Sequence, residues 1–225
     1  MTDKSKVGRM SRRKGQRFER DVCKALTKWW KSEFHRTPMS GGSALKKGFN
    51  LAGDVVTADK SFPFHIECKN QEGWELDHLL TLPTFGKLGE WYAQAYTEAR
   101  KGSIPLLIFT RNNRPVFFLF QWSNVEFEKR HSGLSQFALE VLSSCNVSMT
   151  LNTPYGQHSS SEIKGSTTKF VVGLLNDLTS NVSKEAICKA LNTSVKIAAT
   201  ASKPKKLRCL SKSSTPVSKR KSITL

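Results

Sequence analysis

The stretch GDVVTADKSFPFHIECK, residues 53–69, decides the fold that we expect for this chain. Two β-compatible runs, 54–58 and 62–69, flank the polar residues 59–61, which are typical of a turn. Side chains alternate along a strand, so the apolar residues of the second run share one face and the polar residues share the other. The stretch therefore predicts an antiparallel hairpin with its apolar face turned to a core.

The register of this hairpin brings two carboxylates together. If Lys60 and Ser61 form a two-residue turn, Asp54 lies directly opposite Glu67. Like charges facing each other across a sheet are destabilising unless a cation lies between them, and carboxylate oxygens suit Mg²⁺ or Mn²⁺. Lys69 follows on the same face as Glu67, where its ammonium group can position an attacking water or stabilise charge on a phosphate. These residues predict metal-dependent hydrolysis of phosphodiesters.

Asp54 followed by Glu67-Cys68-Lys69 resembles the D…E-x-K core of the PD-(D/E)XK nuclease superfamily, and its surroundings are most similar to the Holliday-junction-resolvase branch. Members of that branch have an early helix with a catalytic glutamate, matched here by Glu19, and then a loop rich in Gly and Ser, matched by residues 40–43. The resemblance covers residues 12–122. It implies an α/β fold with a restriction-endonuclease-like core, in which helices flank a central mixed sheet. Gly53 departs from the pattern, because the family name has Pro before the aspartate.

The resemblance also implies roles for individual residues. Asp54, Glu67, Lys69 and Glu19 would be catalytic. Asp54, Glu67 and the backbone carbonyl of Cys68 would bind Mg²⁺, for which Mn²⁺ would substitute, with Glu19 as an additional ligand. The residues expected to contact DNA are Arg12, Arg13, Lys14, Ser40, Ser43, Lys46, Lys47 and Gln94. The implied substrate is branched or four-way DNA, and because resolving a junction requires two symmetric cuts, the implied assembly is a homodimer.

Other interpretations of the same residues remain open. A lone E-x-K is common on the solvated face of a strand. Within the nucleases, the alternative is a restriction-type or recombination-associated enzyme acting on duplex DNA or on ends. Outside them, it is a basic nucleic-acid-binding protein without catalysis. Glu19 can equally form an exposed ion pair with the neighbouring arginines, and we expect His65 to lie at the rim of the site or to contact DNA. Convergence of Asp54, Glu67 and Lys69 would separate an enzyme from a binder.

The rest of the chain is predicted from its hydrophobic spacing. It indicates amphipathic helices over 13–33 and 87–101, a buried central strand over 104–109 and a returning strand over 116–122. The expected organisation is a basic N-terminal arm (1–11), a nuclease domain (12–155), a flexible linker (156–168), a small basic helical extension (169–200) and a disordered basic tail (201–225). The extension, with helices expected over 170–177 and 183–191, is either a helix-turn-helix or a plain helical appendage.

Composition limits the partners that the chain can have. Its 225 residues include 36 Lys and Arg against 18 Asp and Glu, a formal net charge of +18. This excess predicts a polyanionic partner, with nucleic acid first and acidic lipid as the weaker alternative. No apolar stretch approaches the ~20 residues that cross a bilayer, and five scattered cysteines without a C-x-x-C pair argue against disulfides or structural zinc. We therefore expect a cytoplasmic, DNA-associated protein without membrane contact.

Overall fold

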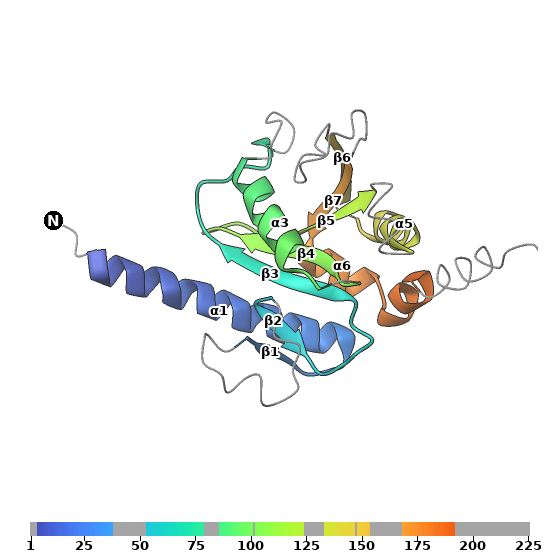
Figure 1. The fold of residues 1–225 in the computed structure, drawn as a ribbon, viewed down its shortest axis with the longest axis horizontal. Helices are drawn as coiled ribbons and strands as arrows, with labels where there is room; N and C mark the ends of the chain where they lie inside the picture. The colour runs from blue at the N-terminus through green and yellow to red at the C-terminus, as the bar shows by residue number, and fades with distance from the viewer. Residues whose placement is uncertain are drawn as a thin grey trace, which may run out of the picture.

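A seven-stranded sheet forms the centre of the computed structural model, which describes residues 4–37, 53–78, 86–100, 102–123, 133–146, 148–153 and 168–191. The strand order is β1-β2-β3-β4-β5-β7-β6 (Figure 1). Strands β3 and β4 are parallel and the other neighbouring pairs are antiparallel, so the sheet is mixed as predicted. The strands are β1 (Phe34–Arg36), β2 (Val55–Thr57), β3 (Phe64–Asn70), β4 (Ile104–Thr110), β5 (Phe117–Ser123), β6 (Ser148–Thr153) and β7 (Thr168–Leu174).

Helices cover both faces of this sheet, which confirms the predicted α/β architecture. The named helices are α1 (Lys4–Trp30), α3 (Gly86–Glu98), α5 (Leu134–Ser144) and α6 (Leu175–Asn181), and residues 184–191 form a further helical segment. Helices α1, α5 and α6 bury their apolar residues in one core cluster. Helix α3 buries Leu88, Trp91 and Tyr92 in a second cluster on the other face (Figure 1). The central strands therefore lie between two apolar layers.

The β2–β3 hairpin has the predicted register. Val55 pairs with Ile66, and the N–H of Phe62 donates to the carbonyl of Asp59 (3.2 Å) across a turn whose two central residues are those predicted. The paired strands are shorter than the predicted runs, and the ladder does not reach the turn. Pro63 contributes to this because it has no N–H to donate. The register nevertheless depends only on the turn and on the alternation of side chains, and both were readable from the sequence.

The second predicted helix and the strands after it are also confirmed. The helix expected over 87–101 is α3, and every residue of β4 is buried, as the continuous apolar run indicated. Asn113 has a φ of 58° in the turn before β5, a backbone conformation that asparagine tolerates well. These elements were predictable because the apolar run and the turn lie next to each other in the sequence.

The helix predicted over 170–177 is wrong over most of its length, whereas the helix predicted over 183–191 is confirmed by the helical residues 184–191. Residues 168–174 are not helical but form β7, which lies between β5 and β6 in the sheet. Phe170 and Val172 join the cluster under α3, and Val171 joins the cluster on the opposite face. A short apolar run that is buried on both sides has no distinguishing period, so a helix and a central strand cannot be separated by spacing alone. A boundary at residue 168 therefore does not separate two domains.

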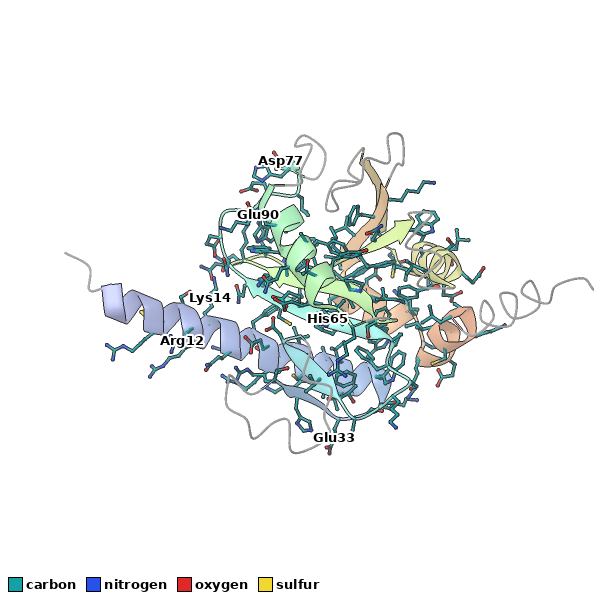
Figure 2. The ribbon with its side chains drawn as sticks, viewed as in Figure 1. Arg12, Lys14, Glu33, His65, Asp77 and Glu90 are labelled. Carbon is teal, nitrogen blue, oxygen red and sulfur yellow. The ribbon has the colours of Figure 1, made fainter. Side chains whose placement is uncertain are left out.

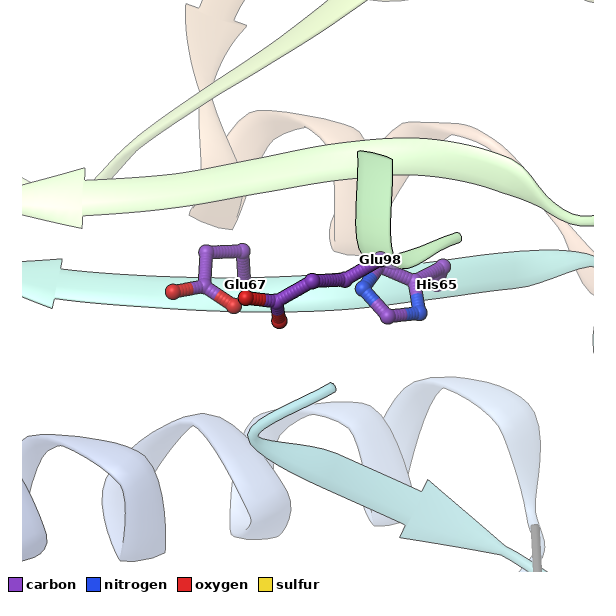
Figure 3. A group of neighbouring side chains, drawn as sticks. All are labelled: His65, Glu67 and Glu98. Atoms are coloured by element: carbon purple, nitrogen blue, oxygen red, sulfur yellow. The ribbon is translucent and has the colours of Figure 1, made fainter. Parts of the chain in front are cut away.

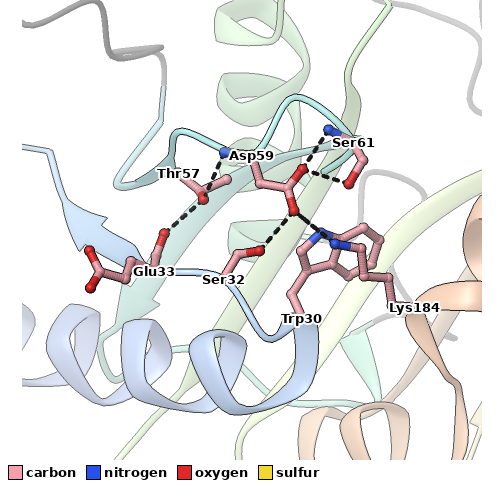
Figure 4. A network of polar contacts seen from close by, with 7 residues as sticks. All are labelled: Trp30, Ser32, Glu33, Thr57, Asp59, Ser61 and Lys184. Carbon is pink, nitrogen blue, oxygen red and sulfur yellow. Dashed lines mark hydrogen bonds and ion pairs between the residues drawn. The ribbon is translucent and has the colours of Figure 1, made fainter.

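The segment after β7 is attached to the start of the fold by a polar network (Figure 4). The Asp59 carboxylate accepts hydrogen bonds from Lys184 Nζ (2.8 Å), Ser32 Oγ (2.8 Å) and Trp30 Nε1 (3.1 Å). The Lys184 and Ser61 bonds hold the pKa of Asp59 well below its usual range. Ile187 is buried in the core that α1 covers, so this helical segment packs on the same core. Residues 192–200, the second half of the proposed helix-turn-helix, lie outside the described residues, as do 154–167 and the tail.

The predicted N-terminal arm is also part of the fold's first helix. Helix α1 begins at Lys4, so residues 4–11 continue the helix rather than precede it. Lys, Arg and Met favour helices, and the sequence contains no proline before residue 38 that would stop one. Figure 1 shows the N-terminal part of α1 extending past the edge of the sheet. Over the described part of the chain, no helix combines the length and the apolar character that crossing a membrane requires.

Candidate active site

Asp54 lies immediately before β2, and two hydrogen bonds hold it against β3. Its N–H donates to the carbonyl of Ile66 (2.9 Å), and its Oδ2 accepts a bond from the N–H of Cys68 (2.8 Å). Burial raises the pKa of the Asp54 carboxyl, while the bond from Cys68 opposes this shift. The neighbouring strand therefore fixes one oxygen of the Asp54 carboxylate.

Glu67 lies in the middle of β3, with its side chain only 4% exposed. Burial, followed by the charge of Asp54, raises its pKa to about 7. Lys69 Nζ lies 2.6 Å from Glu67 Oε1 and opposes this shift. Asp54, Glu67 and Lys69 therefore converge, as the sequence predicted. Burying two carboxylates beside a single lysine is costly for folding, which favours a chemical use for the group.

Glu19 reaches the same region from α1. Its carboxylate accepts a hydrogen bond from Arg36 Nε of β1, and both side chains are largely buried. The Glu19 charge also raises the pKa of Asp54. Glu19 therefore pairs with Arg36 of β1 and not, as the alternative from the sequence proposed, with the neighbouring arginines of its own helix. Glu19 lies close enough to influence Asp54 electrostatically, while its partner Arg36 offsets part of its charge.

Helix α3 contributes two further side chains to the site. Gln94 Oε1 accepts a bond from Lys69 Nζ (2.9 Å), and Gln94 Nε2 donates to Glu98 Oε1 (2.9 Å). Gln94 was predicted to contact DNA, and here its amide orients the lysine from one side. Glu98 was not identified from the sequence. Its spacing of one helical turn from Gln94, on the same helix face, is the signal that could have found it.

His65 was expected at the rim and is instead buried, with 3% of its surface exposed. Burial lowers its pKa, so the imidazole is neutral at pH 7. One ligand atom from each of His65, Glu67 and Glu98 lies within 4.8 Å of the others (Figure 3). Carboxylate oxygens and a neutral imidazole are ligands that divalent metals accept. The donor atoms around Glu67 therefore fit a metal centre.

The backbone at Gly53 explains the departure from the Pro of the superfamily pattern. Gly53 has a φ of +89°, which the ring of proline cannot adopt. A Cβ atom there would also lie 2.6 Å from the carbonyl oxygen of Ile66. This close approach of the two strands lets the next residue, Asp54, reach the N–H of Cys68. Glycine is thus required by the local geometry.

The predicted DNA-contacting residues fall into two groups. Arg12 and Arg13 are exposed on α1, where Figure 2 shows Arg12 away from the sheet, whereas Lys14 Nζ lies 3.2 Å from Glu72 Oε1. Ser40, Ser43, Lys46 and Lys47 lie outside the described residues. Of the predicted contacts that the structure describes, Gln94 alone lies at the carboxylate cluster.

Comparison with known proteins identifies a family. The model of a family described as "Phage putative PDDEXK endonuclease" matches residues 10–189 of the chain. No curated protein matches the chain, and no solved structure matches it. The matched range includes Glu19, the β2–β3 hairpin and α3, and it extends through β7 and α6 almost to the end of the described residues.

Proposed function

Because the chain belongs to the family of phage putative PDDEXK endonucleases, we propose that Asp54, Glu67 and Lys69 are its catalytic centre and that it cuts branched DNA with Mg²⁺. The convergence of these three side chains on β2 and β3 is the observation that carries the assignment. A protein that only binds DNA gains nothing from a buried carboxylate pair whose pKa values are raised. The non-catalytic alternative is therefore disfavoured.

The roles of the residues follow from their positions. Asp54, Glu67 and the carbonyl of Cys68 would hold the divalent ion, which supplies Lewis-acid chemistry and neutralises phosphate charge when bound. Glu19 supports the site through its effect on Asp54. Lys69, oriented by Gln94, directs its ammonium group to the attacking water or to the phosphate oxygen on which charge develops. With Lys69 held between Glu67 and Gln94, little reorganisation is needed when DNA binds.

The proposed substrate is four-way or otherwise branched DNA, cut by a homodimer. The resemblance to junction resolvases supports this choice, and the net charge of +18 supports binding to several phosphates at once. Arg12 and Arg13 are exposed on α1 and make no ion pair with any residue in the described ranges, so they are available for phosphate. Branched DNA is recognised largely through shape and phosphate positions, which suits such a surface.

The test is to incubate the protein with a labelled four-way junction, a duplex, a flap and a single strand in Mg²⁺, Mn²⁺ or Ca²⁺. We expect paired symmetric cuts in the junction with Mg²⁺ and Mn²⁺, and sedimentation as a dimer. Lys69→Ala should lose about 100-fold or more in rate, on the scale of a lost electrostatic group. Lys87→Ala, on the exposed side of α3, is the matched control.

Each result has a definite meaning. Equal cutting of duplex and junction would leave a nuclease but reject the resolvase assignment. A Lys69→Ala protein as active as Lys87→Ala would remove Lys69 from the catalytic centre. Failure of the wild-type protein to cut any of the four DNAs with any ion would contradict the catalytic assignment as a whole.

A further inference from the structure

His65 is a buried polar side chain that the proposed cleavage reaction does not use. It lies two residues before Glu67 on the same face of β3, and 3% of its surface is exposed. Its Nε2 atom has no hydrogen-bond partner among the described residues. Because a buried polar atom without a partner destabilises the folded state, each such atom calls for an explanation, and a bound ion is one of the usual ones.

The surroundings of the imidazole hold it in one orientation. A Cβ atom on Gly53 would lie 3.2 Å from Cε1 and 3.4 Å from Nδ1 of His65, so one edge of the ring packs closely beneath the glycine. Figure 3 shows a nitrogen on the other side of the ring facing the carboxylate of Glu98. The ring is therefore positioned by the strand geometry, and its unpartnered nitrogen is directed at an acidic group.

Glu98 and Glu67 provide the other two donors. One atom from each of the three side chains lies within 4.8 Å of the others, and Figure 3 shows the Glu98 carboxylate between Glu67 and the imidazole. Bonds of about 2.0–2.2 Å to a common cation bring such atoms to at most about 4.4 Å apart. Glu98 is exposed at the end of α3, so a small rotation of its side chain can close the remaining gap.

We propose that His65, Glu67 and Glu98 form a second cation site, next to the pair Asp54 and Glu67, and that it takes a divalent transition metal such as Mn²⁺. The imidazole nitrogen sets the preference, because Mg²⁺ and Ca²⁺ favour ligand sets made only of oxygen. The proposal rests on the proposed function only in that both sites use Glu67. It does not depend on which DNA is cut.

The test uses the full-length protein without DNA, loaded with Mn²⁺ and examined by electron paramagnetic resonance. Pulsed measurements detect a directly bound ¹⁴N nucleus, so we expect nitrogen coupling in the wild-type protein and in Asp54→Asn. His65→Gln should lose that coupling. Glu98→Gln should weaken the nitrogen-coupled site by at least about tenfold, on the scale of losing a group that supports a metal.

Glu98→Gln keeps the test decisive if the buried His65 substitution prevents folding. Its side chain is exposed, and its amide oxygen can still accept the bond from Gln94. Glu90→Gln, an exposed position on the same helix, is the matched control and should bind Mn²⁺ like the wild-type protein (Figure 2). Bound Mn²⁺ without nitrogen coupling in the wild-type protein would overturn the proposal, and so would equal Mn²⁺ binding by the Glu98→Gln and Glu90→Gln proteins.

Failure of the second cation site can be distinguished from failure of the proposed cleavage activity. Cleavage of DNA with Mg²⁺, together with Mn²⁺ bound only to oxygen, would retain the nuclease centre and reject the second site. Nitrogen-coupled Mn²⁺ in a protein that cuts no DNA would support the second site and reject the catalytic assignment.

Discussion

On one face of β3, Phe64, Ile66 and Cys68 pack into the apolar core that α1 covers, whereas His65 and Glu67 on the other face are polar and equally buried. Apolar burial stabilises the fold on the first face. On the second face, burial raises the pKa of Glu67 and leaves a nitrogen of His65 without a partner, both at a cost in stability. Neighbouring residues of one strand thus have opposite effects on the stability of the fold. The effect of a substitution should therefore depend on which face the side chain occupies.

The largest expected effect comes from Glu67→Gln on the polar face. Cleavage should fall by at least about 10² to 10³-fold, because the change removes a negative charge that holds the cation, and the cation stabilises the transition state. The metal-free variant should unfold at a higher urea concentration than the wild-type protein, because the repulsion with Asp54 is relieved. Single-turnover cleavage and urea unfolding measure the two effects. Turnover at the wild-type rate would remove Glu67 from the site.

Ile66→Ala tests the apolar face with the opposite expectation. Ile66 is fully buried, so its truncation should lower the free energy of unfolding by about 2–5 kcal/mol. The protein that remains folded should still cut DNA, because the side chain points away from the carboxylates. The milder Ile66→Val, at about 0.5–1.5 kcal/mol, serves as the graded control. A variant of Ile66 with full stability but no cleavage would contradict the division between the two faces.

A smaller effect should appear in the dependence of stability on pH. In the folded, metal-free protein the pKa of Glu67 is raised from 4.5 to about 7. Between these values the folded state holds a proton that the unfolded chain has released, so the free energy of unfolding should fall as pH rises through this window. Its slope is at most about 1.4 kcal/mol per pH unit for one group. The raised pKa of Asp54 acts in the same direction.

Comparing the wild-type protein with Glu67→Gln isolates this contribution from those of the other titrating groups. The measurement is urea unfolding in the presence of a chelator from pH 4.5 to 8. The difference in stability between the two proteins should widen with pH and then level off above about pH 7. Parallel profiles would show that Glu67 is not the source.

The smallest effect on the fold should follow from ending the chain after Leu191. The deletion removes nine basic and no acidic residues, namely Lys196, Lys203, Lys205, Lys206, Arg208, Lys212, Lys219, Arg220 and Lys221. Both faces of β3 remain, so cleavage should persist, while the slope of log affinity against log salt should become flatter. Binding titrations at several salt concentrations measure the slope. An unchanged slope would show that these residues do not contact phosphate.

A longer deletion, from residue 168 onwards, is the informative contrast. It removes β7 from between β5 and β6, together with the residues of α6 that are buried against α1. We therefore expect loss of cooperative folding, measured by circular dichroism and thermal unfolding. A folded and active protein after this deletion would restore the boundary that the sequence suggested.

The sequence by itself determined the hairpin and its chemistry. The turn around Lys60, the alternation along β3 and the spacing of Asp54 from Glu67 all act within about 15 residues, so the register followed from local rules. The buried run of β4 was equally readable, because its composition matches a strand covered on both faces. Lys69 needed no tertiary information either, since its place on the face of Glu67 follows from strand periodicity.

Only the tertiary structure decided the position of β7, the burial of His65 and the approach of Glu98. Each depends on a packing contact that residue spacing does not report: β5 and β6 enclose β7, Gly53 packs against His65, and α3 brings Glu98 from beyond residue 86. Spacing within a short run reports how a segment buries its own apolar residues, but not which distant element it meets. Packing of α3 on the sheet therefore brings Glu98 next to the predicted carboxylate pair and makes a larger cluster.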